Sequence, residues 1–174
     1  MSNLDIASYN RQGKVFCGAN VAAVNHIVVG TSETGLGLTN PWGSGKKLIL
    51  VDFGFSATSV STAVTAVGLA VGLPTVLAPT SFTRVAIQKA DCSGPASDSV
   101  AVLWGAATFV TAPIAIRWVG GNLWVTGGTG DHPYYINDKP EGAIVVVPGA
   151  SVCTVVLGAT QAGTASFTWI EVPV

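Results

Sequence analysis

Charge is what this chain has least of. Of its 174 residues, 8 are basic and 9 acidic, so charged residues make up 10% of the chain and hydrophobic residues 49%. An ordinary soluble domain carries roughly 25% charged residues. A surface with so few charges must consist of uncharged polar residues, or be buried against other subunits. The net charge of −1 provides no field that would attract nucleic acid or an anionic membrane surface.

The chain also lacks the patterns of membrane insertion, export and disulfide bonding. Residues 53–83 carry no charge, but serines, threonines and two prolines leave an apolar part shorter than the roughly 20 residues of a spanning helix. The first five residues have neither the basic start nor the apolar run of a signal peptide, so we expect synthesis in a cytoplasm. Cys17, Cys92 and Cys153 are odd in number and widely spaced, which argues against a disulfide framework.

What the chain does have is a series of short strand patterns. The strongest is residues 46–55, whose alternation predicts Ile49, Val51, Phe53 and Phe55 on one face and the residues between them on the other. Further strands are predicted over residues 21–29, 67–71, 85–89, 100–104, 108–111, 114–118, 134–136, 142–147, 151–157 and 165–172. Most are flanked by Gly, Pro, Ser or Asp, the residues typical of turns.

These strands predict an all-β fold, a single antiparallel β-sandwich of jelly-roll-like type, because no segment of ten or more residues shows clean helical periodicity. Residues 1–20 are predicted to form an extended N-terminal arm, and residues 21–174 the sandwich domain. Two local predictions accompany this assignment. Gly120–Asn122 is predicted as a hairpin turn, and residues 142–147 as a strand buried on both faces.

Three features that could carry chemistry fail on inspection. The run from Gly43 to Lys47 lacks the first glycine and the Ser/Thr of a phosphate-binding loop, and it precedes a strand rather than a helix. Asp131 and His132 lie in a glycine-rich loop whose carboxylates do not have the offsets of a calcium loop. No local signature pairs a cysteine with a histidine as a nucleophile. We therefore expect no enzymatic activity, no metal and no cofactor.

Five tryptophans leave two interpretations open. In an all-β protein such residues close the core or lie in an interface. Trp169, on the final predicted strand, is expected in the core. The alternative is an exposed platform of tryptophans that binds sugars. The positions of Trp42, Trp118 and Trp124 distinguish the two interpretations, because a glycan site requires them to gather in an open groove.

The C-terminal third resembles a known family. Pro140–Ala150 and Gly163–Pro173 look like the closing strands of jelly-roll head-decoration and head-fibre proteins of tailed bacteriophages. Asn40–Gly45, before Leu48–Leu50, is similar to a turn-and-strand element of the same proteins. The resemblance implies a trimeric β-sandwich that caps capsomer junctions, without a cofactor and without catalytic residues. The chain lacks the long stalk of many fibre proteins, which favours a decoration role.

The leading hypothesis is a structural virion protein, a decoration or cement subunit made in the host cytoplasm and placed on the capsid exterior. Its expected partners are copies of itself, as a homotrimer, and the major capsid protein, with no nucleic acid and no membrane. The alternative is a head-fibre or tail-fibre module that recognises surface glycans; a weaker option is a tumour-necrosis-factor-like or cupin-like domain with a ligand cavity. The candidate interface residues are Asn3, Asp5, Tyr9, Arg11, Trp42, Trp118 and Trp124.

Overall fold

The computed structural model describes residues 5–58, 65–72, 81–122 and 134–174 of the chain. These residues form short strands and one helix. In chain order the elements are α1 (Ile6–Arg11), β1 (Val15–Ala19), β2 (Val24–His26), β3 (Ser32–Thr39), β4 (Lys46–Ala57), β5 (Thr65–Gly72), β6 (Ser81–Val85), β7 (Gln88–Lys89), β8 (Val102–Thr108), β9 (Ile114–Asn122), β10 (Tyr135–Asp138), β11 (Ile144–Val146), β12 (Ser151–Gly158) and β13 (Gln161–Pro173).

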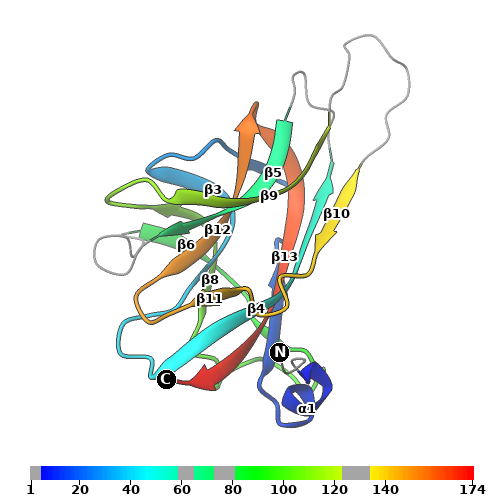
Figure 1. The fold of residues 1–174 in the computed structure, drawn as a ribbon, viewed down its shortest axis with the longest axis vertical. Coiled ribbons are helices and arrows are strands. Elements are labelled where there is room, and N and C mark those ends of the chain that lie inside the picture. Colours follow the sequence, from blue (N-terminus) through cyan, green and yellow to red (C-terminus); the bar gives the residue numbers. More distant parts are fainter. Residues whose placement is uncertain (1–4, 59–64, 73–80, 123–133) are drawn as a thin grey trace.

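Two antiparallel sheets pack face to face, which confirms the predicted β-sandwich (Figure 1). The seven-stranded sheet has the order β10-β4-β13-β1-β7, with β11 also paired to β4 and β2 to β13. The six-stranded sheet has the order β6-β8-β3-β12-β5-β9. The helix α1 and the C-terminus lie at the same end of the sandwich.

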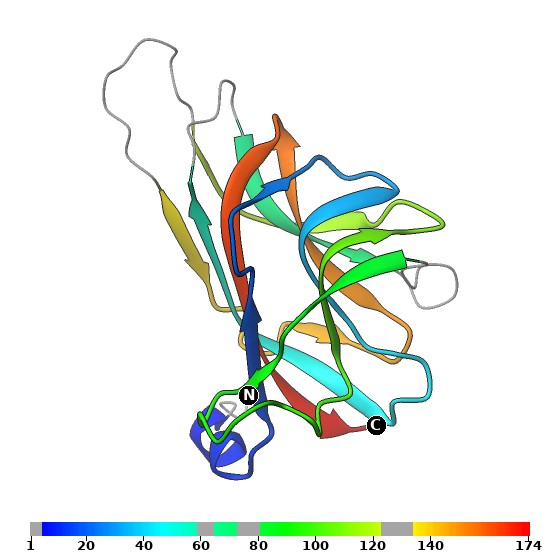
Figure 2. The same ribbon diagram turned by 180° about the vertical axis from the view of Figure 1, so that it is seen from behind.

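The strands pair in a nested order. β1 pairs with β13, β3 with β12, β4 with β10, and β5 with β9, all antiparallel. The first strand therefore lies beside the last (Figure 2), and each step inward along the chain forms the next pair. Rolling one long antiparallel hairpin into two sheets produces this pairing, which is the strand arrangement of a jelly roll.

The core fills the space between the two sheets and is rich in aromatic rings. Phe53 and Phe167 lie opposite each other on β4 and β13, with ring centroids 5.5 Å apart. Phe16 and Trp169 pair across β1 and β13 at 6.2 Å. Trp169 is fully buried, as the sequence predicted. Because β13 pairs with both β1 and β4, its inward side chains form the centre of the core.

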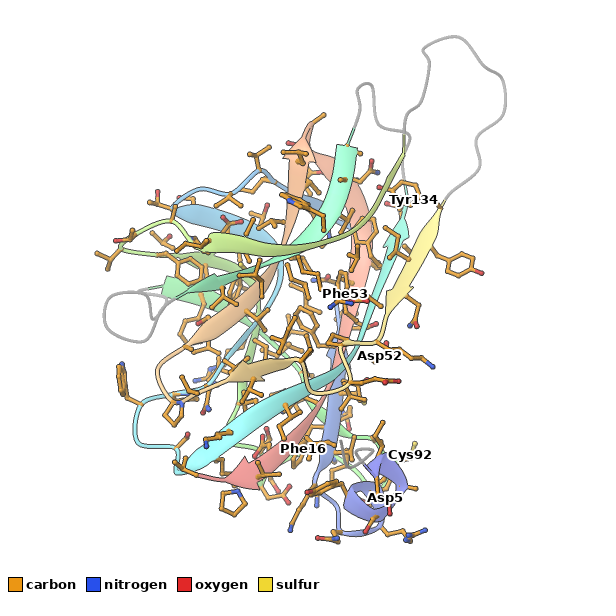
Figure 3. The ribbon with its side chains drawn as sticks, in the orientation of Figure 1. Asp5, Phe16, Asp52, Phe53, Cys92 and Tyr134 are labelled. Carbon is orange, nitrogen blue, oxygen red and sulfur yellow. The ribbon has the colours of Figure 1, made fainter. Side chains whose placement is uncertain are left out.

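A bulge in β4 corrects the predicted facing of this strand. Thr168 pairs with Asp52 but Trp169 pairs with Leu50, so Val51 is an extra residue on β4. The inward face is therefore Leu48 and Leu50 before the bulge and Phe53 and Phe55 after it. Strict alternation fails because an extra residue reverses the side on which later side chains fall. Phe53 belongs to the core, whereas Asp52 bonds to Asn137 on the opposite face of β4 (Figure 3).

The predicted N-terminal arm of residues 1–20 is wrong over most of its described length. Val15–Ala19 form β1, which is paired with β13 along its whole length. Before it, α1 packs Ile6 and Tyr9 against a small cluster of Val15, Val51 and Ile170. This cluster lies on the outer face of the seven-stranded sheet, the face directed away from the other sheet. Ile6 and Tyr9 are too few to form a core alone, but they pack on apolar side chains that the sheet already presents.

Two further local predictions are wrong. β9 continues through Gly120–Asn122 and pairs there with β5, instead of turning. The glycine at position 121 allows this close approach, since a Cβ atom there would lie 2.5 Å from the Thr65 carbonyl oxygen. Residues 144–146 form β11, but Val145 is 44% exposed, so this strand is buried on one face only. Ile144 and Val146 of β11 face the core, whereas Val145 points to the outer side of the sheet. In the sheet, β11 pairs with β4.

A buried carboxylate fixes one end of the sandwich. Glu171 is 2% exposed and follows Phe167 and Trp169 on the inward side of β13. It accepts hydrogen bonds from Lys46 Nζ at 2.9 Å, Ser99 Oγ at 2.6 Å and the Val100 N–H at 3.2 Å. These bonds join β13 to β4 and to the segment before β8. A buried charge is tolerated only with such partners.

We predict that Trp169→Ala lowers the free energy of unfolding by about 3–5 kcal/mol, the usual loss for a large buried aromatic side chain. Urea unfolding followed by circular dichroism measures this value. Tyr135→Ala is the matched control, because the Tyr135 side chain is 82% exposed and its loss should change stability little. A Trp169→Ala variant that unfolds at the parent's urea midpoint would contradict the assignment of Trp169 to the core.

We also predict that deleting residues 1–11 destabilises the sandwich by about 2 kcal/mol, because Ile6 and Tyr9 no longer cover Val15, Val51 and Ile170. The melting temperature of the deleted chain, compared with that of Arg11→Ala, tests this expectation. Arg11 is exposed, so its substitution should be nearly neutral. An unchanged melting temperature in the deleted chain would instead indicate the loosely attached arm that the sequence suggested.

Candidate functional site

Of the predicted interface residues of the N-terminus, Tyr9 and Arg11 lie on α1 and Asp5 precedes it. Asp5 caps the helix, its carboxylate accepting from the Ser8 N–H at 3.0 Å. Tyr9 packs against the sheet. Arg11 is exposed in the last turn of the helix, where the helix dipole stabilises a positive charge. Asn3 lies outside the described residues. Asp5 and Arg11 therefore remain accessible to a partner, whereas Tyr9 is half-buried.

The two candidate tryptophans among the described residues, Trp42 and Trp118, do not form a common groove. Trp42, 62% exposed, packs on Gly149 before β12, where an added Cβ atom would lie 2.4 Å from the indole ring. Trp118, 44% exposed, packs on Gly68 of β5. Trp124 lies outside the described residues. Each described ring covers a different glycine on a different part of the sandwich, so Trp42 and Trp118 do not provide the predicted sugar platform.

Trp118 belongs to an apolar strip that sequence reasoning named only in part. β9 is the last strand of the six-stranded sheet, and Ile114, Ile116 and Trp118 on it are 55%, 49% and 44% exposed. The one charged side chain of β9, Arg117, forms an ion pair with Asp138 at 2.7 Å. Ala115 pairs with Ala70 and Arg117 pairs with Leu69, so Ile116 is an extra residue on β9, and Ile114 and Trp118 fall on opposite faces of the strand. These side chains are exposed because β9 is the last strand of its sheet, which a single segment of sequence does not specify.

The three segments that carry the family resemblance meet at one corner of the sandwich. Asn40 is fully buried, and its amide donates to the carbonyl oxygens of Lys46 at 2.8 Å and Val146 at 2.9 Å. The backbone carbonyl oxygen of Asn40 accepts a hydrogen bond from the Gly149 N–H at 2.6 Å. The Val174 N–H donates to the Gly45 carbonyl oxygen at 3.1 Å. One buried asparagine therefore joins the start of β4 to the segment around β11, and the chain end after β13 closes the same corner.

Two buried titratable side chains lie on β2 and β3. His26 Nδ1 lies 2.8 Å from Thr154 Oγ1, which also accepts from the Leu36 N–H. Burial lowers the pKa of His26 to about 4, partly opposed by a hydrogen bond with the Gly163 backbone. The histidine is therefore neutral near pH 7. Position 35 must be glycine beside it, since φ is +136° and a Cβ atom would lie 2.6 Å from His26 Nδ1.

Glu33 is the second of these groups and is 1% exposed. Its Oε1 accepts from the Gly30 N–H at 2.7 Å, whereas Oε2 has no hydrogen-bond partner among the described residues. Burial raises the pKa of Glu33 to about 7, with the Gly30 hydrogen bond acting in the opposite direction. Burial also raises the pKa of the Cys153 thiol, and Glu33 adds to that effect.

The described residues contain no cluster of three or more His, Cys, Asp and Glu side chains that could hold a metal ion. Asp131 and His132 lie outside those residues. Cys17, Cys92 and Cys153 are free thiols. Within the described ranges, no helix has both the length and the apolar character needed to cross a membrane.

The fold and surface together define an antiparallel β-sandwich of nested strand order with an exposed apolar edge strand. No protein-family model, curated protein or solved structure matches the chain.

We predict that Glu33→Gln makes stability depend on pH between about 4.5 and 6.5, where the parent's stability is nearly constant. In the parent, the depressed pKa of His26 makes stability rise with pH from about 4 to 6.5, because the unfolded chain binds the extra proton. The raised pKa of Glu33 makes stability fall with pH from 4.5 to about 7, because the folded chain binds the extra proton. The two slopes oppose each other over the shared range.

In Glu33→Gln only the His26 slope remains, so the free energy of unfolding should increase by about 2 kcal/mol between about pH 4.5 and 6.5. Urea unfolding at several pH values measures the slope. His26→Gln is the reciprocal variant and should show the opposite slope. Parallel pH profiles for the parent and both variants would show that neither group titrates differently in the folded state.

Proposed function

We propose that this chain is a structural virion protein, a decoration or cement subunit on the exterior of a tailed-bacteriophage capsid. It would act as a homotrimer that contacts the major capsid protein and stabilises the head by adding contacts between subunits. This role needs a compact module with surfaces that join other proteins. The low charge of the chain and its β-sandwich fold support the proposal.

The observation that carries the proposal is the exposed apolar edge of β9. An edge strand presents unpaired backbone N–H and C=O groups, and natural proteins usually protect such an edge with lysine, proline or a bulge. β9 has two register shifts against β5, but it displays Ile114, Ile116 and Trp118 and only the paired charge of Arg117. Burying these side chains between subunits would recover about 25 cal/mol for each Å² of apolar surface.

The corner around Asn40 gives further support. The segments that resemble head-decoration proteins are far apart in the chain, yet they are hydrogen-bonded neighbours in the fold. A resemblance that falls on one connected structural unit has more weight than three unrelated matches. Trp42 and Val145 are exposed within this unit and are available for contacts with a capsid shell.

The alternative drawn from the sequence was a head-fibre or tail-fibre module that binds glycans through tryptophans. The separate positions of Trp42 and Trp118 remove its main support among the described residues. Glycan binding through residues other than these tryptophans is a separate proposal.

We predict that the purified chain is a trimer at micromolar concentration and that Ile116→Lys weakens the assembly, because it places a charge in the apolar strip. Size-exclusion chromatography with light scattering measures both masses. Val21→Lys is the control, since Val21 is 96% exposed and lies outside β9. A monomeric parent, or an Ile116→Lys variant that stays as associated as the parent, would contradict assembly through β9.

The capsid role itself is tested by sedimenting the purified chain with phage heads assembled without it. The trimer should pellet with the heads and raise the temperature at which they release DNA. Free chain remaining in the supernatant at every concentration would refute the decoration role, whatever the oligomeric state.

A further inference from the structure

A second surface lies on the outer face of the seven-stranded sheet, where the side chains that line a depression are uncharged and the Asp52 carboxylate lies beside them. α1 and its apolar contacts cover the part of this face around Val15, Val51 and Ile170. Beyond the bulge the face is uncovered by other described elements and holds a depression of about 420 Å³, within the range of small-molecule sites. Its lining comprises Ala19, Asn20, Gly54, Phe55, Ser56, Tyr135, Ile136, Asn137, Thr164, Ala165 and Ser166.

The floor of this depression is built from small side chains in register. Ser56 on β4 pairs with Tyr135 on one side and Thr164 on the other. Gly54, two residues earlier, pairs with Asn137 and Ser166. An added Cβ atom at Gly54 would lie 2.7 Å from Ser166 Oγ, so glycine keeps the floor low at that point. The cross-strand rows therefore combine a shallow surface with hydroxyl groups.

These hydroxyls are available to a ligand. The side-chain hydroxyl groups of Ser56, Thr164 and Ser166 make no hydrogen bond with another described residue. Asn137 is held in place, because its amide nitrogen donates to both Asp52 carboxylate oxygens, at 3.0 and 3.2 Å. Its side-chain carbonyl oxygen remains as an acceptor. The surface thus offers three hydroxyl groups and one fixed amide oxygen at neighbouring positions of the paired strands β10, β4 and β13.

Tyr135 supplies the apolar part of this surface. Its side chain is 82% exposed, although a tyrosine usually buries part of its ring. An exposed tyrosine offers a flat apolar face and a polar tip at low conformational cost, which suits recognition of a ligand with both kinds of surface. Ile136, its neighbour on β10, points the other way and packs against the core, which fixes the strand that carries Tyr135.

We propose that this surface binds a neutral oligosaccharide. A sugar ring has an apolar C–H face, which would stack on Tyr135, and hydroxyl groups, which would bond to Ser56, Thr164, Ser166 and Asn137. The lining contains no carboxylate, lysine or arginine, so neither an acidic glycan nor a nucleic acid finds a counter-charge there. A peptide strand would pair with a sheet edge through its backbone, whereas these groups project from a sheet face.

The far end of the depression is rigid, which limits the cost of binding. Asn20 donates to the Gly35 carbonyl oxygen at 3.0 Å and accepts from the Ala165 N–H at 3.1 Å. Its side chain therefore links the end of β1 to both sheets. A site formed on paired strands and fixed side chains loses little entropy when a ligand binds. This inference is independent of the capsid role and would hold for a monomer.

Isothermal titration with maltohexaose, cellohexaose and chitohexaose, beside sialyllactose as an acidic probe, tests the proposal. At least one neutral hexasaccharide should bind with a dissociation constant in the millimolar range or tighter, with little dependence on salt. Tyr135→Ala should weaken binding roughly tenfold or more, and Tyr135→Phe should retain most of it. Asn137→Ala should also weaken binding, because it removes the fixed acceptor.

Trp42→Ala is the matched control, because Trp42 is also an exposed aromatic residue but lies outside the depression. The affinity of Trp42→Ala for the neutral hexasaccharide should equal that of the parent. Circular dichroism should show that every variant is folded. Binding of none of the neutral hexasaccharides overturns the proposal. So does binding that survives Tyr135→Ala, that is lost in Trp42→Ala, or that is confined to sialyllactose. The masses of these variants by light scattering report separately on assembly through β9.

Discussion

The pairing of β4 with β13 determines which side chains enter the core and which face outward. These two strands pair from Gly163 with Ala57 to Pro173 with Lys46, and the extra residue Val51 interrupts the register. On one side of the bulge, Leu50 and Trp169 face inward together; on the other, Phe53 and Phe167 do. A regular strand would have turned one of these two halves toward solvent. The bulge therefore allows a single long strand to contribute to the core over its whole length.

The same bulge divides the outer face of the seven-stranded sheet into two parts with different chemistry. On the side of Val51, the outward residues are apolar, and α1 is needed to cover Val15 and Ile170. On the other side, the outward residues of β4 are Asp52, Gly54 and Ser56, which need no cover. The bulge therefore decides which residues β4 contributes to each part, whereas β1 and β13 contribute theirs by regular alternation.

The sequence predicts elements whose signal is local and misses those whose signal is tertiary. Alternation located β4, β12 and β13, and the burial of Trp169 followed from its strand. The bulge at Val51 was invisible because it is defined by the partner strand, which a single segment does not specify. α1 was read as an arm because six residues with two apolar side chains do not form a stable helix alone. The sheet that stabilises α1 includes Ile170, which lies 164 positions after Ile6 in the chain.

The candidate surfaces follow the same rule. Trp118 was chosen for its residue type, and its neighbours Ile114 and Ile116 were missed because only the sheet order shows that β9 is an edge. Tyr135, Ser56 and Thr164 are about 110 residues apart at the extremes, and no sequence pattern links them before β4, β10 and β13 are paired. Asn40 looked like an ordinary turn residue, although it is fully buried and joins distant segments.

The scarcity of charge has two different structural outcomes on this molecule. On the seven-stranded sheet, serine, threonine, asparagine and tyrosine, with the Asp52 carboxylate beside them, give a surface that water solvates well. On the edge of the six-stranded sheet, isoleucine and tryptophan give a surface that water solvates poorly. Only the second gains free energy by association with a large partner, whereas the first suits a ligand that replaces water hydrogen bonds one by one. The two surfaces belong to different sheets, but the ion pair between Arg117 and Asp138 joins β9 to β10, the strand that carries Tyr135, so the polar face begins beside the apolar edge.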